Sequence, residues 1–263
     1  MALLESGNPA LSEKRFRDTI LDDVVTNENA MTVKGTLQKF GFLFLMVMAT
    51  SYYSWKEAVE GGNSNALMIG GAIAGFVVAI VMGFKPQLGQ YLAPLFALCE
   101  GLFLGAVSAY FEYKFAARQD YYGGGYSGIV FQAVSLTFAT VAGMYLLYKF
   151  NIIKASKQLR AIIFTASLGL AIFYAGCAIA SWGFHANLPE FLFKGSILGI
   201  AFSAVVVTIA ALRLILDFDM IEKGAETGAP KYMEWYAAFG LLVTIVWLYM
   251  EILRLLSKLN SRN

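Results

Sequence analysis

Residues 214–224 read LILDFDMIEKG, and residues 230–236, a few positions later, read PKYMEWY. The first stretch closes an apolar segment of membrane-crossing length, and the second opens another such segment, which carries Glu251 and Arg254. Charged side chains at the mouth of one hydrophobic helix and inside the next are costly in lipid, which makes them functional candidates by default. These two segments predict a helical membrane protein whose buried polar residues carry its chemistry.

The composition of the whole chain supports this interpretation. Of its 263 residues, 58% are hydrophobic and 14% are charged, whereas a soluble domain carries roughly a quarter charged residues. A transmembrane helix needs roughly 17 to 25 mostly apolar residues. Seven segments have that character, at residues 39–55, 66–84, 91–111, 129–148, 161–182, 196–216 and 235–256. The sequence therefore predicts an all-α integral membrane protein with seven transmembrane helices in one bundle.

Short connections between these segments predict three regions. Residues 1–38 form a cytoplasmic N-terminal tail, residues 39–256 the seven-helix domain, and residues 257–263 a short C-terminal tail. The first 34 residues mix acids with bases and have no apolar core after a basic start, so they do not predict a cleavable signal. No long basic stripe or zinc-finger spacing indicates a nucleic-acid partner.

Lysine and arginine residues near the ends of the spans predict the orientation in the membrane. The linker 149–160 carries four positive charges and no acid, which is typical of the cytoplasmic side. This places the N-terminus in the cytoplasm and the C-terminus outside. The mouth formed by Asp217 and Asp219 then faces the cytoplasm.

Polar residues inside the spans are further candidates for function. Glu100 lies about half-way through the third span, so it must face the interior and find a donor there, or stay protonated. Glu251 and Arg254 share a helix face and are expected to pair with each other, a structural role. Arg213 lies one turn before Asp217, where it either extends to the cytoplasmic interface or pairs with that aspartate.

Asp217 and Asp219 point about 200° apart on a continuous helix, so they cannot face the same cavity. One is expected to point inward and the other to lie at the interface. An inward carboxylate in a partly dry cleft can switch with pH or bind a hard cation such as calcium. Asp217 is therefore the candidate metal ligand. The alternative is that both acids simply solvate the end of a helix.

Three pairs of glycines have the small-x-x-x-small spacing that lets helix backbones approach closely in lipid. They lie at residues 71–75, 101–105 and 195–199. The spacing predicts that the second, third and sixth spans pack inside the bundle.

With LDFDMIEKG at 216–224, the sequence resembles the Bax inhibitor-1 family, in which an aspartate ends the sixth helix and a charged turn leads to a seventh. The pair EG at 100–101 also looks like a family element. NPAL at 8–11 and MTVKGT at 31–36 are similar to a bacterial branch of the family. The resemblance extends over essentially the whole chain.

The resemblance implies a bundle with helix seven at its centre, a cation leak pathway, notably for calcium, and a bacterial inner membrane. It also implies two aspartates, one ending helix six and one in helix seven, that share a proton and close the pore under the control of pH. Asp217 matches the first, but the second falls near Thr244, which cannot titrate. The acids near the mouth that are candidates for the place of this second aspartate are Asp219, Glu222 and Glu234.

The sequence is compatible with two functions and argues against a third. The first is a cation leak channel or exchanger, with Asp217 as gate or ligand, Glu100 as an interior polar site, Ca²⁺ or H⁺ as permeant ions and no bound cofactor. The second is a non-conducting regulator that binds another membrane protein, such as a protease or a stress-response complex. An enzyme is disfavoured, because the single histidine, His185, lies in a predicted outer loop and the spans carry no catalytic set.

Overall fold

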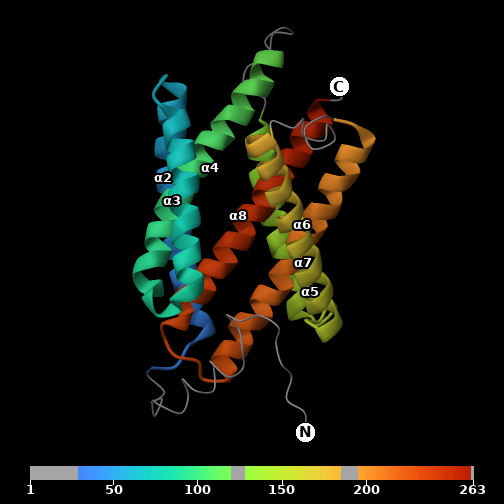
Figure 1. Cartoon of the computed structure of the whole chain (residues 1–263). Helices are drawn as coiled ribbons and strands as arrows, with labels where there is room; N and C mark the ends of the chain where they lie inside the picture. The colour runs from blue at the N-terminus through green and yellow to red at the C-terminus, as the bar shows by residue number, and fades with distance from the viewer. Residues whose placement is uncertain (1–28, 120–127, 185–194, 262–263) are drawn as a thin grey trace. The chain divides into compact units, whose positions relative to one another are not determined.

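The computed structural model describes residues 29–119, 128–184 and 195–261 of the chain (Figure 1), so His185 lies outside the described residues. Within these ranges the chain forms seven α-helices and one 3₁₀ turn, with no strand element. The helices are α2 (Val33–Val59), α3 (Ser64–Phe84), α4 (Gly89–Gln119), α5 (Ile129–Lys149), α6 (Lys157–Phe184), α7 (Ile197–Glu226) and α8 (Met233–Asn260), and the turn is η2 (Pro86–Leu88).

Six of the described helices, α3 to α8, are long and apolar enough to cross a membrane. The prediction of an all-α membrane protein is confirmed. Helix α2 has 27 residues and contains the predicted first span 39–55, but it is not among the six. The reason is a polar and aromatic run in its second half, TSYYSW at 50–55. That α2 also crosses the membrane stays a prediction.

Polar side chains define where the helices begin. Four of the starts have a residue whose side chain accepts the backbone N–H three positions on, the usual N-cap arrangement. These residues are Thr32, Asn63, Ser156 and Ser196. Helix α5 begins differently, after Gly128 at a φ of 68°. There the buried carboxylate of Glu112 in α4 accepts from the N–H groups of Gly128 and Val130, at 2.6 and 3.2 Å.

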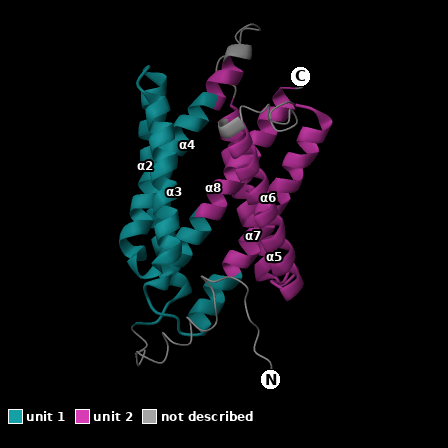
Figure 2. Cartoon of the chain, viewed as in Figure 1, with its two compact units in different colours: residues 1–110, 219–242 teal, residues 111–218, 243–263 magenta. Residues whose placement is uncertain are grey.

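The helices group into two compact units (Figure 2). Unit 1 comprises residues 1–110 and 219–242, and unit 2 comprises residues 111–218 and 243–263. Helices α4, α7 and α8 each contribute to both units. The prediction of one continuous bundle stays a prediction. Helix α2 starts inside the predicted N-terminal tail, and α8 extends to Asn260, through most of the predicted C-terminal tail.

Glycines bring three helices of unit 1 into backbone contact. A methyl group added at Gly71 of α3 would lie 2.7 Å from the carbonyl oxygen of Cys99 in α4. One added at Gly105 of α4 would overlap the carbonyl of Ser51 in α2. The Ser51 hydroxyl also donates to the carbonyl of Gly101, at 3.0 Å. These close approaches explain the glycine pairs at 71–75 and 101–105.

Burial differs strongly between the candidate spans. More than half of the apolar window of α4 and of α8 is buried (56% each), whereas the share is 33% in α7, 17% in α3 and 6% in α6. Burial of the third span was predicted correctly. The prediction for the second span was wrong for most of its surface, because only the side of α3 that carries Gly71, Gly75, Val78 and Met82 is buried. The apolar side chains that remain exposed on these helices are suited to contact with lipid.

Candidate functional site

Helix α7 places Asp217 on the buried face of unit 2. Val206, Ala210 and Leu214 precede it at spacings of four, four and three residues, which is the period of one helix face. All three are at most 1% exposed, and Asp217 itself is 7% exposed. The helical period thus carries a carboxylate into an apolar interior, where a charge is costly unless it is paired or used.

The neighbour of Asp217 on the following helix is Thr244 of α8. Its hydroxyl donates a hydrogen bond to the Asp217 carboxylate, and the residue is 2% exposed. The carboxylate oxygen Oδ2 is also buried, and it has no hydrogen-bond partner among the described residues. A buried polar atom in this state costs about 1–3 kcal/mol. Asp217 therefore offers an acceptor that a proton, a cation or a water molecule can fill.

The other candidates near this end of α7 have different partners. Arg213 acts on Asp217 through its charge, but within the described residues the two form no ion pair. Asp219 is bound by Lys223, with a distance of 2.8 Å between Oδ1 and Nζ. The two aspartates thus have different partners, as their spacing indicates, and Asp219 is itself buried. That one of the two lies at the membrane interface stays a prediction. Glu222 is exposed.

The described residues contain no group of three or more His, Cys, Asp or Glu side chains that could hold a metal ion. Calcium takes six to eight oxygen ligands, from carboxylates, backbone and amide carbonyls, and water. A cation at Asp217 would therefore have no cage of several carboxylates around it in this part of the chain.

Glu100 of α4 lies against α3 in unit 1. Its Oε2 is 3.2 Å from the position that a Cβ would take at Gly75, so the glycine makes room for the carboxylate. The Glu100 carboxylate has no hydrogen bond or ion pair with any of the described residues. The interior donor that the sequence predicts is therefore not found in this part of the chain. Glu100 is half-buried.

Glu251 and Arg254 form the ion pair that their spacing predicts. Arg254 Nη1 lies 2.9 Å from Glu251 Oε1 and donates to the hydroxyl of Tyr174 in α6 at 2.9 Å.

Sequence reasoning missed Lys258, which lies on the same side of α8 and is 2% exposed. Its ammonium group donates to the Ser203 hydroxyl at 2.8 Å and to the Gly199 carbonyl at 3.1 Å. The signal in the sequence was the seven-residue spacing from Glu251 to Lys258, which is two helical turns and places both residues on one face of α8.

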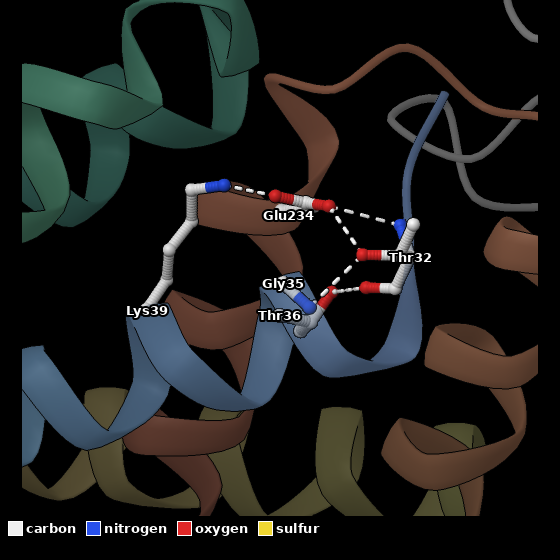
Figure 3. Close-up of polar contacts among 5 residues, drawn as sticks. All are labelled: Thr32, Gly35, Thr36, Lys39 and Glu234. Carbon is white, nitrogen blue, oxygen red and sulfur yellow. Dashed lines mark hydrogen bonds and ion pairs between the residues drawn. The ribbon is translucent and has the colours of Figure 1, made fainter. Parts of the chain in front are cut away.

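Glu234, in the first turn of α8, belongs to a separate cluster in unit 1. Figure 3 shows its carboxylate between Thr32 and Lys39. Oε1 accepts from both the N–H and the hydroxyl of Thr32, each at 2.9 Å, and Oε2 accepts from Lys39 Nζ. Glu234 is 1% exposed. Both oxygens of this candidate substitute partner are therefore hydrogen-bonded within unit 1.

The same cluster joins two segments that sequence analysis singled out, 31–36 and 230–236. Beside it, Met31 N–H donates to the Ala229 carbonyl at 2.6 Å, and Lys231 N–H donates to the Asn29 carbonyl at 2.9 Å. The residues that lead into α2 are thus tied to the turn that leads into α8.

Comparison with known proteins agrees with this architecture. A family model described as Bax inhibitor 1 like matches residues 8–261 of the chain. The protein belongs to the Bax inhibitor 1-like family. A search of curated proteins and a search of solved structures gave no match. The resemblance stated from residues 216–224 is therefore confirmed at the level of the family.

Within the Bax inhibitor 1-like family, the contact between Asp217 and Thr244 is what distinguishes this chain from the two-aspartate arrangement that the resemblance implies. The side chain that meets the aspartate from α8 is a hydroxyl. A threonine orients the carboxylate by donating one hydrogen bond, but it has no second titratable proton to share. Among the described residues, this contact between α7 and α8 thus brings together one acid and one hydroxyl, and not two acids.

Proposed function

We propose that this protein is a cation leak channel or exchanger with calcium as its main permeant ion, that it lies in a bacterial inner membrane with its N-terminus in the cytoplasm, and that it catalyses no reaction. Asp217 carries the proposal. It is a buried carboxylate on a membrane-crossing helix, and its Oδ2 has no partner among the described residues. Intramembrane acids mark ion pathways by default, and acidic side chains select cations.

The proposed role of Asp217 follows from its two oxygens. One side of the carboxylate is oriented by Thr244. Oδ2 accepts from no donor in the described part of the chain, so it can coordinate a cation in transit. Protonation of the same group would remove its charge and with it the attraction. A single carboxylate is therefore enough to make permeation depend on pH, without a second acid.

Asp217→Asn is expected to lower calcium flux into dye-loaded proteoliposomes about tenfold, which corresponds to roughly 1.4 kcal/mol in the barrier. The amide keeps the size of the side chain but removes the charge that attracts the cation. The matched control is Asp219→Asn, the same chemical change two residues along α7, at a carboxylate bound by Lys223. Its flux is expected to stay near that of the wild type.

Equal flux in the wild type and Asp217→Asn would contradict the proposal. No flux above empty liposomes would favour the non-conducting regulator. Co-purification of a membrane protein that survives Glu100→Gln but is lost when residues 1–34 are deleted would then support that alternative.

Thr244→Asp is expected to change the shape of the pH dependence of this flux. The wild type should titrate in one step, because one acid is present at the contact. Two interacting carboxylates instead lose their protons in two macroscopic steps, so the variant should show two. Calcium flux over a series of pH values gives the measurement, with Thr244→Val as the control that keeps a single acid. A one-step profile in Thr244→Asp would show that residue 244 and Asp217 are not coupled.

A further inference from the structure

Helices α7 and α8 meet in unit 2 along one seam with a fixed register. Asp217 of α7 meets Thr244 of α8, and Ser203 of α7 meets Lys258 of α8. Between the two contacts each helix covers fourteen residues, in opposite directions, which is about 21 Å on an α-helix. The equal spacing defines one continuous antiparallel contact, which we call the α7–α8 seam.

The two ends of the α7–α8 seam carry opposite charges. Asp217 places a carboxylate at one end, and Lys258 places an ammonium group at the other. Between them the face of α7 is apolar and buried, with Val206, Ala210 and Leu214. The two charges are too far apart to form an ion pair, so each depends on its own surroundings.

The ammonium group of Lys258 is bound by neutral oxygen atoms. It donates to the Ser203 hydroxyl at 2.8 Å and to the Gly199 carbonyl at 3.1 Å, and it forms no ion pair in the described part of the chain. Glu251 acts on it through charge, but that carboxylate is bound by Arg254. Because a buried charge is normally paired with an opposite one, this end of the seam holds one excess positive charge among the described residues.

The oxygen atoms around this ammonium indicate what else they could bind. The Ser203 hydroxyl and the Gly199 carbonyl lie one turn apart on α7 and converge on a single cationic group. Channels and transporters hold cations in passage with neutral oxygens, above all backbone carbonyls. The lysine therefore fills acceptors that suit a small cation, whereas Oδ2 of Asp217, at the other end, has no partner among the described residues.

We infer that the ammonium group of Lys258 is a tethered cation, which occupies a small-cation site at the end of the α7–α8 seam opposite Asp217 and closes that end to permeating ions. Its positive charge repels an arriving cation, and its side chain occupies the oxygen atoms of Ser203 and Gly199. The closure, but not the cation site, rests on the proposed function, because it requires that ions pass along the seam.

Lys258→Ala tests the cation site without any measurement of flux. The substitution removes three carbons and the ammonium group, which propylammonium can replace. In detergent micelles, propylammonium at roughly ten times its dissociation constant should raise the melting temperature of the full-length variant by about 3 °C and leave that of the wild type unchanged. Propanol, which has no charge, and tetramethylammonium, which cannot donate a hydrogen bond, should have no effect. The matched control is Lys154→Ala, at an exposed lysine, which should not respond.

Lys258→Met tests the closure through calcium flux into dye-loaded proteoliposomes. Methionine keeps an apolar side chain of similar length in place but removes the charge. A fixed charge near the path of a cation is worth at least about tenfold in rate at an effective dielectric constant of roughly 20, so flux should rise by that factor. Lys154→Met should conduct like the wild type.

Each outcome decides one part of the inference. A propylammonium shift confined to Lys258→Ala supports the cation site, as does recovery of that variant in folded form only with propylammonium present. No shift, an equal shift with propanol, or failure to fold even with propylammonium overturns it. Unchanged flux in Lys258→Met overturns the closure. If the wild type and every variant conduct no better than empty liposomes, the proposed function and the closure both fail, while the melting temperatures still decide the cation site.

Discussion

Gly105→Ala is expected to lower the free energy of unfolding by about 3 kcal/mol, near the upper end of the usual cost of overpacking a core. The added methyl group would overlap the carbonyl of Ser51 in α2. That atom belongs to the backbone of a helix and cannot move aside as a flexible side chain would. The helices must separate, and the 3.0 Å hydrogen bond from the Ser51 hydroxyl to the Gly101 carbonyl is then weakened as well.

The matched control is Gly169→Ala in α6, where an added Cβ meets nothing within 4 Å. Alanine is a better helix former than glycine by about 1 kcal/mol, so this variant should be as stable as the wild type or slightly more stable. Thermal unfolding in detergent micelles, followed by circular dichroism, compares the two. If both variants melt together, the contact between α2 and α4 is not the close one described.

The helices themselves could be predicted from sequence, because apolar segment length is a local property. Hydropathy located all seven, and it was least decisive for α2, where TSYYSW at 50–55 interrupts the apolar run. The pair Glu251 and Arg254 was also predictable, since residues three apart on a helix share a face. Pairs of glycines predicted the close approach to α4, but they could not show that the rest of α3 faces outward.

Contacts between distant segments were beyond local reasoning. The register of Asp217 against Thr244 came only from the family resemblance, because periodicity says nothing about which residue of the next helix is opposite. Thr32 and Glu234 are 202 residues apart, and no spacing rule connects them. The ammonium of Lys258 is buried between Ser203 and Gly199, a contact that the predicted span 235–256 does not include, because α8 continues beyond the predicted end of that span.

Glu234→Gln is expected to lower the free energy of unfolding by about 3 kcal/mol. Removing one partner of a buried ion pair leaves the other charge without compensation, and here that charge is the ammonium of Lys39, whose side chain is only 18% exposed. The amide also brings an NH₂ group into a site where Thr32 and Lys39 both donate. One of these donors must then lose its acceptor.

Two further variants separate this ion pair from a general effect of charge. Glu226→Gln makes the same chemical change at an exposed residue, the last of α7, and should alter the unfolding free energy by at most about 0.5 kcal/mol. Lys39→Met combined with Glu234→Gln removes both charges, so it should recover part of the stability lost in Glu234→Gln alone. Because the Glu234 carboxylate joins the start of α2 to the start of α8, a melting temperature for Glu234→Gln equal to that of the wild type would mean that this junction contributes nothing to stability.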